Sequence, residues 1–110
     1  MFKYQRGEVY LAQEIQTQPN EGILKTRLWV LVGATPVNAA RSTVVAAPLS
    51  THAKEIAGLS IPVNIHQTVF FVILDQLRAV DKKRFMRCES ALSADEMSLI
   101  DDGLRQVLTL

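Results

Sequence analysis

The hydrophobic residues of this chain gather in short runs, and polar or turn-forming residues separate one run from the next. Runs of this length that are rich in β-branched and aromatic residues are typical of buried strands. They predict strands at residues 9–12, 27–32, 44–51, 59–63 and 68–74, and residues 77–80 continue the sheet after a bend. We expect the fourth strand at an edge because it contains Pro62. The fifth is the most strand-like and is expected to be central.

The pattern changes near the end of the chain from the strand period to a helical one. Ser93 and Glu96 have the spacing of a capping box, and Leu92 and Met97 stand at the positions of a hydrophobic staple. A helix is therefore predicted over residues 94–108. Its apolar residues form one stripe: Met97, Ile100, Leu104, Val107 and Leu108. The prediction is a mainly β fold, a small barrel or half-barrel, whose C-terminal helix covers an open end or a partner subunit.

Two connections between these elements differ from the rest. Residues 13–25 are polar and rich in turn-forming residues, which predicts a long surface loop. Loops of about a dozen residues without secondary structure are uncommon in compact domains and are often functional. Residues 34–41 form a connector, in which we expect one helical turn that begins at Thr35 and Pro36.

The composition indicates a single domain over residues 1–110. No run reaches the roughly 18 consecutive apolar residues of a membrane span, and the first residues are too polar for a signal peptide. Cys88 is the only cysteine, which excludes an internal disulfide and a paired-cysteine zinc site. We therefore expect a cytoplasmic protein without a membrane segment. Because the net charge is only +1, any nucleic-acid site must be local.

One pair of predicted strands brings candidate chemistry to a single place. If residues 27–32 and 44–51 are antiparallel neighbours, the guanidinium of Arg27 and the hydroxyls of Ser50 and Thr51 lie at the same edge of the sheet. A cation beside two small hydroxyl groups predicts a phosphate site, and both strand ends adjoin polar loops. The alternative is an arginine in solvent and two hydroxyl residues that cap a turn.

Other polar residues near strand ends carry weaker signals. Asp75 and Gln76 close the most apolar strand, where a carboxylate can also cap the next turn. His52 suggests a general base, but it adjoins Thr51, and neighbouring residues of an extended chain point to opposite faces. The basic cluster at 82–84 is typical of a solvated face and could also contact phosphates without sequence preference. The sequence has no nucleotide-binding loop, dinucleotide fingerprint or zinc signature, so we expect neither a cofactor nor a metal.

Several motifs carry a resemblance to a known family: Arg6-Gly7-Glu8-Val9-Tyr10 at the start, Thr26-Arg27 before an apolar strand, Pro48-Leu49-Ser50-Thr51 at the end of the next, and the run from Leu74 to Arg84. Over nearly its full length the chain resembles the MazF/PemK (Kid-like) toxin endoribonucleases of bacterial toxin–antitoxin systems. The resemblance implies an SH3-like β-barrel that forms a homodimer and binds a cognate antitoxin protein. It also implies metal-independent cleavage of single-stranded RNA, to 2′,3′-cyclic phosphate and 5′-hydroxyl ends, which inhibits translation and growth.

The family's site residues are carried over position by position. Its catalytic arginine falls on Arg27 and its catalytic threonine on Ser50, or on Thr51 if the register slips by one residue. Its RNA-binding residues fall on Glu21, Thr26, Thr51, Asp75 and Gln76. The sequence departs from the family at Leu28, where a proline usually follows the arginine, and in the loop before Arg27, which is altered and lengthened. The loop departure bears on RNA sequence preference.

Three questions stay open at this level. The base that removes the 2′-hydroxyl proton could be Arg27, Glu21 or His52. The chain could be a catalytically degenerate member of the family. It could also act as the CcdB gyrase poisons do, which share the fold and inhibit a protein without chemistry. Those toxins carry their gyrase contacts in a Trp-Gly-Ile-like ending, whereas this chain ends Leu108-Thr109-Leu110 and its only tryptophan is Trp29.

Overall fold

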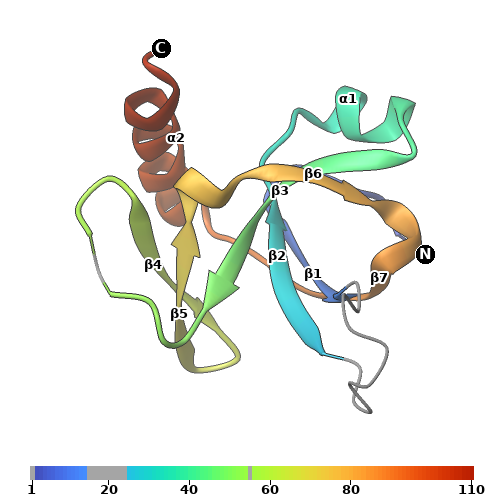
Figure 1. The fold of residues 1–110 in the computed structure, drawn as a ribbon, viewed down its shortest axis with the longest axis horizontal. Helices are drawn as coiled ribbons and strands as arrows, with labels where there is room; N and C mark the ends of the chain where they lie inside the picture. The colour runs from blue at the N-terminus through green and yellow to red at the C-terminus, as the bar shows by residue number, and fades with distance from the viewer. Residues whose placement is uncertain (1, 15–24, 55) are drawn as a thin grey trace.

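The computed structural model describes residues 2–14, 25–54 and 56–110, which form a curled antiparallel sheet and two helices (Figure 1). The strands are β1 (Glu8–Gln13), β2 (Thr26–Leu31), β3 (Thr43–Ser50), β4 (Ser60–Ile65), β5 (Thr68–Ile73), β6 (Arg78–Asp81) and β7 (Phe85–Ala91). The helices are α1 (Thr35–Ala40) and α2 (Ala94–Leu108), and two 3₁₀ turns are η1 (Leu74–Gln76) and η2 (Lys82–Arg84). The predicted mainly β fold with a C-terminal helix is confirmed.

The strand order is β4-β5-β3-β2-β1-β7, and β6 pairs with β3 outside this path. The strand that contains Pro62 therefore lies at an edge, and β5 has a partner on each side, as the sequence predicted. In Figure 1, β4, β5 and α2 lie to one side of β3, and β1, β2 and β7 lie to the other. The short helix predicted at Thr35 is α1.

β3 belongs to both halves of the sheet. Its residues Thr43–Ala46 pair with β6 and Leu49–Ser50 pair with β5, so this ladder is interrupted at Ala47 and Pro48. A proline has no N–H to give to a neighbouring strand, and Pro48 lies in the interruption. The η1 turn joins β5 to β6 across from it. On this side of β3, neither β5 nor β6 pairs with Pro48. The buried strand therefore contains a proline without losing a hydrogen bond to these two strands.

Each face of the sheet has its own apolar core, because side chains of successive residues leave a strand on opposite faces. In β2, Val30 belongs to one cluster, whereas Trp29 and Leu31 belong to the other. In β1, Val9 and Tyr10 divide in the same way, and both are fully buried. A strand that is buried on both faces has a continuous apolar sequence, and for this reason the hydrophobic runs located the strands.

The predicted capping box at the start of α2 is formed. Ser93 Oγ accepts a hydrogen bond from Glu96 N (3.1 Å), and Glu96 Oε1 accepts one from Ser93 N (3.0 Å). Glu96 Oε2 also accepts a hydrogen bond from Asn64 N of β4 (2.9 Å), which ties the helix to the sheet. Burial raises the pKa of Glu96, but these hydrogen bonds outweigh it and hold the pKa below its ordinary value.

The apolar stripe of α2 packs on the chain's own core. Ile100 is fully buried, and Met97, Leu104 and Val107 pack against the cluster that contains Val30. The helix therefore covers the chain's own core, as the first of the two predicted arrangements expected, while Leu108 of the same stripe stays 49% exposed. No helix in the described part of the chain is long and apolar enough to cross a membrane.

Gly103 allows α2 to lie close to the turn that precedes β4. A Cβ atom at this position would be 2.3 Å from Leu74 Cδ1 and 2.9 Å from the backbone oxygen of Gly58. The end of the leucine side chain could adjust, but the oxygen of Gly58 is a backbone atom and can move only if the turn itself shifts. The close helix packing therefore depends on the missing side chain.

The strand β7 and the contacts of the Arg6-Gly7 motif are two features of the fold that the sequence did not predict. β7 was not predicted, and it pairs with β1 at the end of the sheet. The Arg6-Gly7 motif is structural: Arg6 Nε donates to Val32 O (2.8 Å), and Arg6 Nη2 forms an ion pair with Asp101 of α2 (2.5 Å). Gly7 has a φ of +92°, a conformation that glycine adopts readily. The motif thus joins the strand β2 to the C-terminal helix.

Candidate functional site: an arginine-lined pocket

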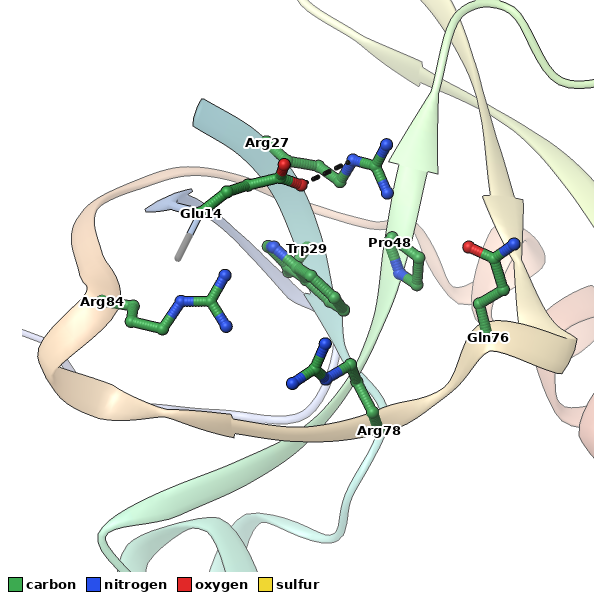
Figure 2. Close-up of a pocket in the computed structure, with 7 residues that line it drawn as sticks. All are labelled: Glu14, Arg27, Trp29, Pro48, Gln76, Arg78 and Arg84. Atoms are coloured by element: carbon green, nitrogen blue, oxygen red, sulfur yellow. Dashed lines mark ion pairs between the residues drawn. The ribbon is translucent and has the colours of Figure 1, made fainter. Parts of the chain in front are cut away.

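A pocket of about 470 Å³ opens where β2, β3 and the η1–β6–η2 segment meet (Figure 2). It is lined by Glu14, Arg27, Trp29, Pro48, Gln76, Arg78 and Arg84. We call this the arginine pocket. Its volume lies in the range of small-ligand sites and is sufficient for part of a nucleotide chain. Three positive charges and one negative charge surround it, so it favours an anion.

The sheet register places the lining residues. Trp29 of β2 pairs with Pro48 of β3, and Arg27 lies two residues before Trp29, on the same face of the strand. Arg78 of β6 pairs with Ala46 of β3 and approaches from the other side of β3. Figure 2 shows the guanidinium groups of Arg78 and Arg84 pointing toward Trp29, with Gln76 on the far side. The pocket is therefore assembled from four separate stretches of sequence.

Arg27 is held by an ion pair at the rim. Its Nε lies 3.2 Å from Glu14 Oε1, and the two side chains are 39% and 32% exposed. Glu14 N also donates a hydrogen bond to Lys25 O (2.8 Å), which joins the two ends of the connection between β1 and β2. The ion pair therefore fixes the position of the Arg27 guanidinium group, which is partly exposed to solvent. The carboxylate of Glu14 occupies a place at this group where a phosphate could bind.

The opposite wall of the pocket contains donors. Arg84 Nε donates to Gln13 O (2.7 Å), which fixes the orientation of its guanidinium group. The side chain of Arg78 is exposed and has no hydrogen-bond or ion-pair partner among the described residues. Trp29 is only 3% exposed, and its Nε1 has no hydrogen-bond partner within the part of the chain that the structure describes. Buried N–H groups are nearly always paired, so this one is an exception among the described residues.

The predicted hydroxyl residues lie at the end of β3. The β2–β3 register, carried two residues beyond Trp29 and Pro48, puts Ser50 across from Arg27. Ser50 Oγ accepts a hydrogen bond from His52 N (3.1 Å), so it also caps the turn that follows, as the alternative interpretation expected. Thr51 is exposed and follows β3. Neither hydroxyl residue lines the arginine pocket in the described structure, although Ser50 shares the strand face of Pro48.

The remaining predicted residues are divided by the structure. Gln76 lines the pocket, whereas its neighbour Asp75 is exposed and does not. Thr26 is exposed at the start of β2 and pairs with Gln13. Glu21 lies outside the described residues. Of the seven residues assigned from the resemblance, the structure therefore brings Arg27 and Gln76 together in one pocket.

Five of the described lining residues were not among the predicted site residues: Glu14, Trp29, Pro48, Arg78 and Arg84. Arg84 belongs to the basic cluster for which phosphate contact was considered, so its signal was present. Glu14 lies at the start of the long loop predicted over residues 13–25, and site residues often lie on such loops. Trp29 looked like a core residue, and most of its surface is indeed core. In the described residues, no group of three or more His, Cys, Asp or Glu side chains could hold a metal ion.

Comparison with known proteins decides the family. The family model of PemK-like, MazF-like toxins of type II toxin–antitoxin systems matches residues 5–108. The chain belongs to this family. No curated protein sequence matches it. The predicted membership of the MazF/PemK family is thus confirmed over nearly the whole chain.

Solved structures with the same fold include several MazF proteins. MazF of a MazE–MazF crystal structure (Form-II) from Deinococcus radiodurans has a TM-score of 0.82 at 16% identity, over 100% of this chain and 99% of that one. An endoribonuclease from a mycobacterial species has a TM-score of 0.79 at 20% identity, over 100% and 95%. A mycobacterial endoribonuclease in complex with its cognate antitoxin has a TM-score of 0.76 at 20% identity, over 96% and 95%. The predicted barrel of the MazF type is confirmed.

Proposed function

We propose that this MazF/PemK-family toxin is an endoribonuclease that cleaves single-stranded RNA without a metal ion, and that the arginine pocket is its RNA site. The observation that carries the proposal is the position of Arg27: its guanidinium lies half exposed at the rim of a cationic pocket, across from the end of β3. Family membership and the likeness to proteins named endoribonucleases support the same activity. A cytoplasmic location fits this substrate.

The proposed reaction is a transesterification within the RNA. The 2′-oxygen attacks the adjacent phosphorus and loses its proton, the bond to the 5′-oxygen breaks, and that oxygen gains a proton. The products carry a 2′,3′-cyclic phosphate and a 5′-hydroxyl. Arg27 would bind two oxygens of the phosphorane, because its planar fork matches them and it stays charged. Ser50 would hold the phosphate in register. The proposal assigns phosphate recognition, not proton transfer, to these two residues.

The test replaces these groups one at a time. Arg27→Ala should lower the cleavage rate about 10²–10³-fold, the usual effect of removing one transition-state donor. Arg27→Lys should restore little, because an ammonium group cannot reproduce the fork. Arg41→Ala is the matched control, since Arg41 is exposed and does not line the pocket. An Arg27→Ala protein that is folded by circular dichroism and cleaves RNA at the wild-type rate would contradict the proposal.

The hydroxyl role is tested separately. Ser50→Ala should slow cleavage, and Ser50→Thr should be tolerated because threonine is the family's own residue. Thr51→Ala should have little effect, which decides between the two hydroxyls. Wild-type cleavage should continue in EDTA, since no step of the proposed chemistry uses a metal. Inhibition of DNA gyrase by a wild-type protein that leaves RNA intact would instead favour the CcdB-like alternative.

The proposal includes two partners. The first is an acidic, partly disordered segment of a cognate antitoxin that folds along the RNA groove, where basic residues gather. MazF–MazE structures from Deinococcus radiodurans share this fold. The second is another copy of the chain, in a two-fold symmetric dimer. Antitoxin binding should block RNA cleavage competitively, and light scattering should give twice the chain mass. Full cleavage in the antitoxin complex would refute the shared groove.

A further inference from the structure

One wall of the arginine pocket has only donors, and the proposed reaction uses none of them. Arg78 and Arg84 point toward Trp29, and Trp29 Nε1 is a buried donor without a described acceptor (Figure 2). Among the described lining residues the one carboxylate, that of Glu14, is paired with Arg27 at the rim. An incoming group that carries several acceptors and a negative charge would satisfy this wall.

We infer that this wall, formed by Arg78 and Arg84 beside the ring of Trp29, is a second subsite that binds a neighbouring phosphate of the RNA backbone. The inference rests on the proposed function, because it adds a contact to the same RNA. Arg27 holds the phosphate that reacts, and the second subsite holds the next one along the strand. Its role is to fix the position of the RNA, without chemistry.

The geometry of the two arginines favours a phosphate. Arg84 Nε is engaged by Gln13 O at 2.7 Å, which leaves its terminal amino groups as an oriented pair of donors. Arg78 has no internal partner in the described residues, so its guanidinium is available without breaking a bond. Arginine forks bind phosphate oxygens in pairs, and a backbone phosphate is present at every nucleotide. The subsite is therefore expected to bind RNA of any sequence.

The chain offers a direct reporter of this subsite, because Trp29 is its only tryptophan. We would titrate the protein with 2′-O-methyl RNA oligonucleotides of equal length, which lack the reacting hydroxyl and cannot be cleaved. Three homopolymers of U, A and C separate phosphate contact from base recognition. Binding is followed by fluorescence anisotropy of a labelled oligonucleotide and by the emission of Trp29, which should change when the subsite fills.

The test variants are Arg78→Gln and Arg84→Gln, and Arg41→Gln is the control with the same change of charge. Each test variant should bind about tenfold more weakly, by the same factor for all three homopolymers. The slope of log Kd against log salt should fall by about 0.7 for each lost phosphate contact. Arg41→Gln should bind within about twofold of wild type.

The outcomes separate this inference from the function on which it rests. Wild-type protein that neither binds nor cleaves single-stranded RNA would overturn both. Wild-type protein that cleaves RNA, together with Arg78→Gln and Arg84→Gln proteins of unchanged affinity and salt slope, would overturn the second subsite alone. A loss confined to one homopolymer would do the same, because the wall would then recognise a base. Arg78→Gln keeps the test valid if Arg84→Gln misfolds, since Arg78 has no internal partner among the described residues.

Discussion

The ion pair between Glu14 and Arg27 leads to a prediction about how tightly the protein binds the phosphate that reacts. If Arg27 binds this phosphate, RNA must displace a carboxylate that already lies 3.2 Å from Arg27 Nε. Replacing Glu14 by glutamine removes the competing charge and keeps the length of the side chain. It also keeps the backbone hydrogen bond from residue 14 to Lys25 O. Glu14→Gln should therefore tighten the binding of uncleavable RNA.

The exposure of the pair sets the size of the effect. Two unit charges at 3.2 Å attract by about 1 kcal/mol in water and about 5 kcal/mol at an effective dielectric constant of about 20. Both side chains are more than 30% exposed, so the lower end applies, and measured pairs of this kind give about 0.2–1 kcal/mol. This corresponds to an affinity about 1.4- to 5-fold higher. The gain should fade as salt rises, because exposed charges are screened.

The assay is fluorescence anisotropy with a labelled 2′-O-methyl oligonucleotide at low and high salt. Asp102→Asn is the control. Asp102 forms an ion pair with Arg105 (2.9 Å) on α2, and the substitution changes the net charge of the protein by the same amount as Glu14→Gln. Tighter binding by Glu14→Gln alone supports a phosphate at Arg27. Unchanged or weaker binding by Glu14→Gln, or an equal gain in the control, would refute the reasoning. A tighter complex that cleaves RNA more slowly would give Glu14 a part in proton transfer.

Two further predictions concern the stability of α2. Glu96→Ala should lower the free energy of unfolding by about 1–2 kcal/mol at pH 7, and Asp95→Ala by about 0.5 kcal/mol or less, as measured by urea denaturation. Because the folded-state pKa of Glu96 is lowered, its contribution is present at neutral pH and is lost progressively as the pH falls below about 4.5; a wild-type advantage of the same size at pH 7 and pH 3 would contradict this. Gly103→Ala should destabilise by about 1 kcal/mol, because overpacking against Gly58 outweighs the gain of up to about 1 kcal/mol in helix propensity. A Gly103→Ala protein that is more stable than wild type would show that the turn at Gly58 can move to accommodate the added methyl group.

The sequence was informative where side chains decide the structure. The strands that contain Trp29 and Val30 were found because both faces are buried, and α2 was found because its cap is local. β7 was missed because Phe85 is its one buried residue. Its strand conformation comes from backbone hydrogen bonds to β1, with two shifts in register. Backbone pairing of this kind leaves no hydrophobic pattern in the sequence.

The same distinction applies to the site. Arg27 and Gln76 could be proposed because each lies at the end of an apolar strand, which a hydrophobic run reveals. Arg78 and Arg84 reach the pocket because β6 pairs with β3 and η2 follows it. That pairing is non-local, so charge alone could not separate these arginines from solvated ones. Their role became visible only when Trp29 was seen between them.

The position of β1 between β2 and β7 has a consequence for the protein during its synthesis. Glu8 lies beside Ala91, so the sheet closes only after most of the chain has left the ribosome. Pairing two strands that lie far apart in the sequence has a large entropic cost of loop closure, and such pairings tend to form late in folding. An incomplete chain that ends before Arg84 has Arg27 and Arg78 but lacks Arg84 of the pocket, as well as the helix that covers the core. A nascent chain of this architecture is therefore expected to lack the complete arginine pocket until Arg84 has been synthesised, and the pairing of β1 with β7 until Ala91 has been.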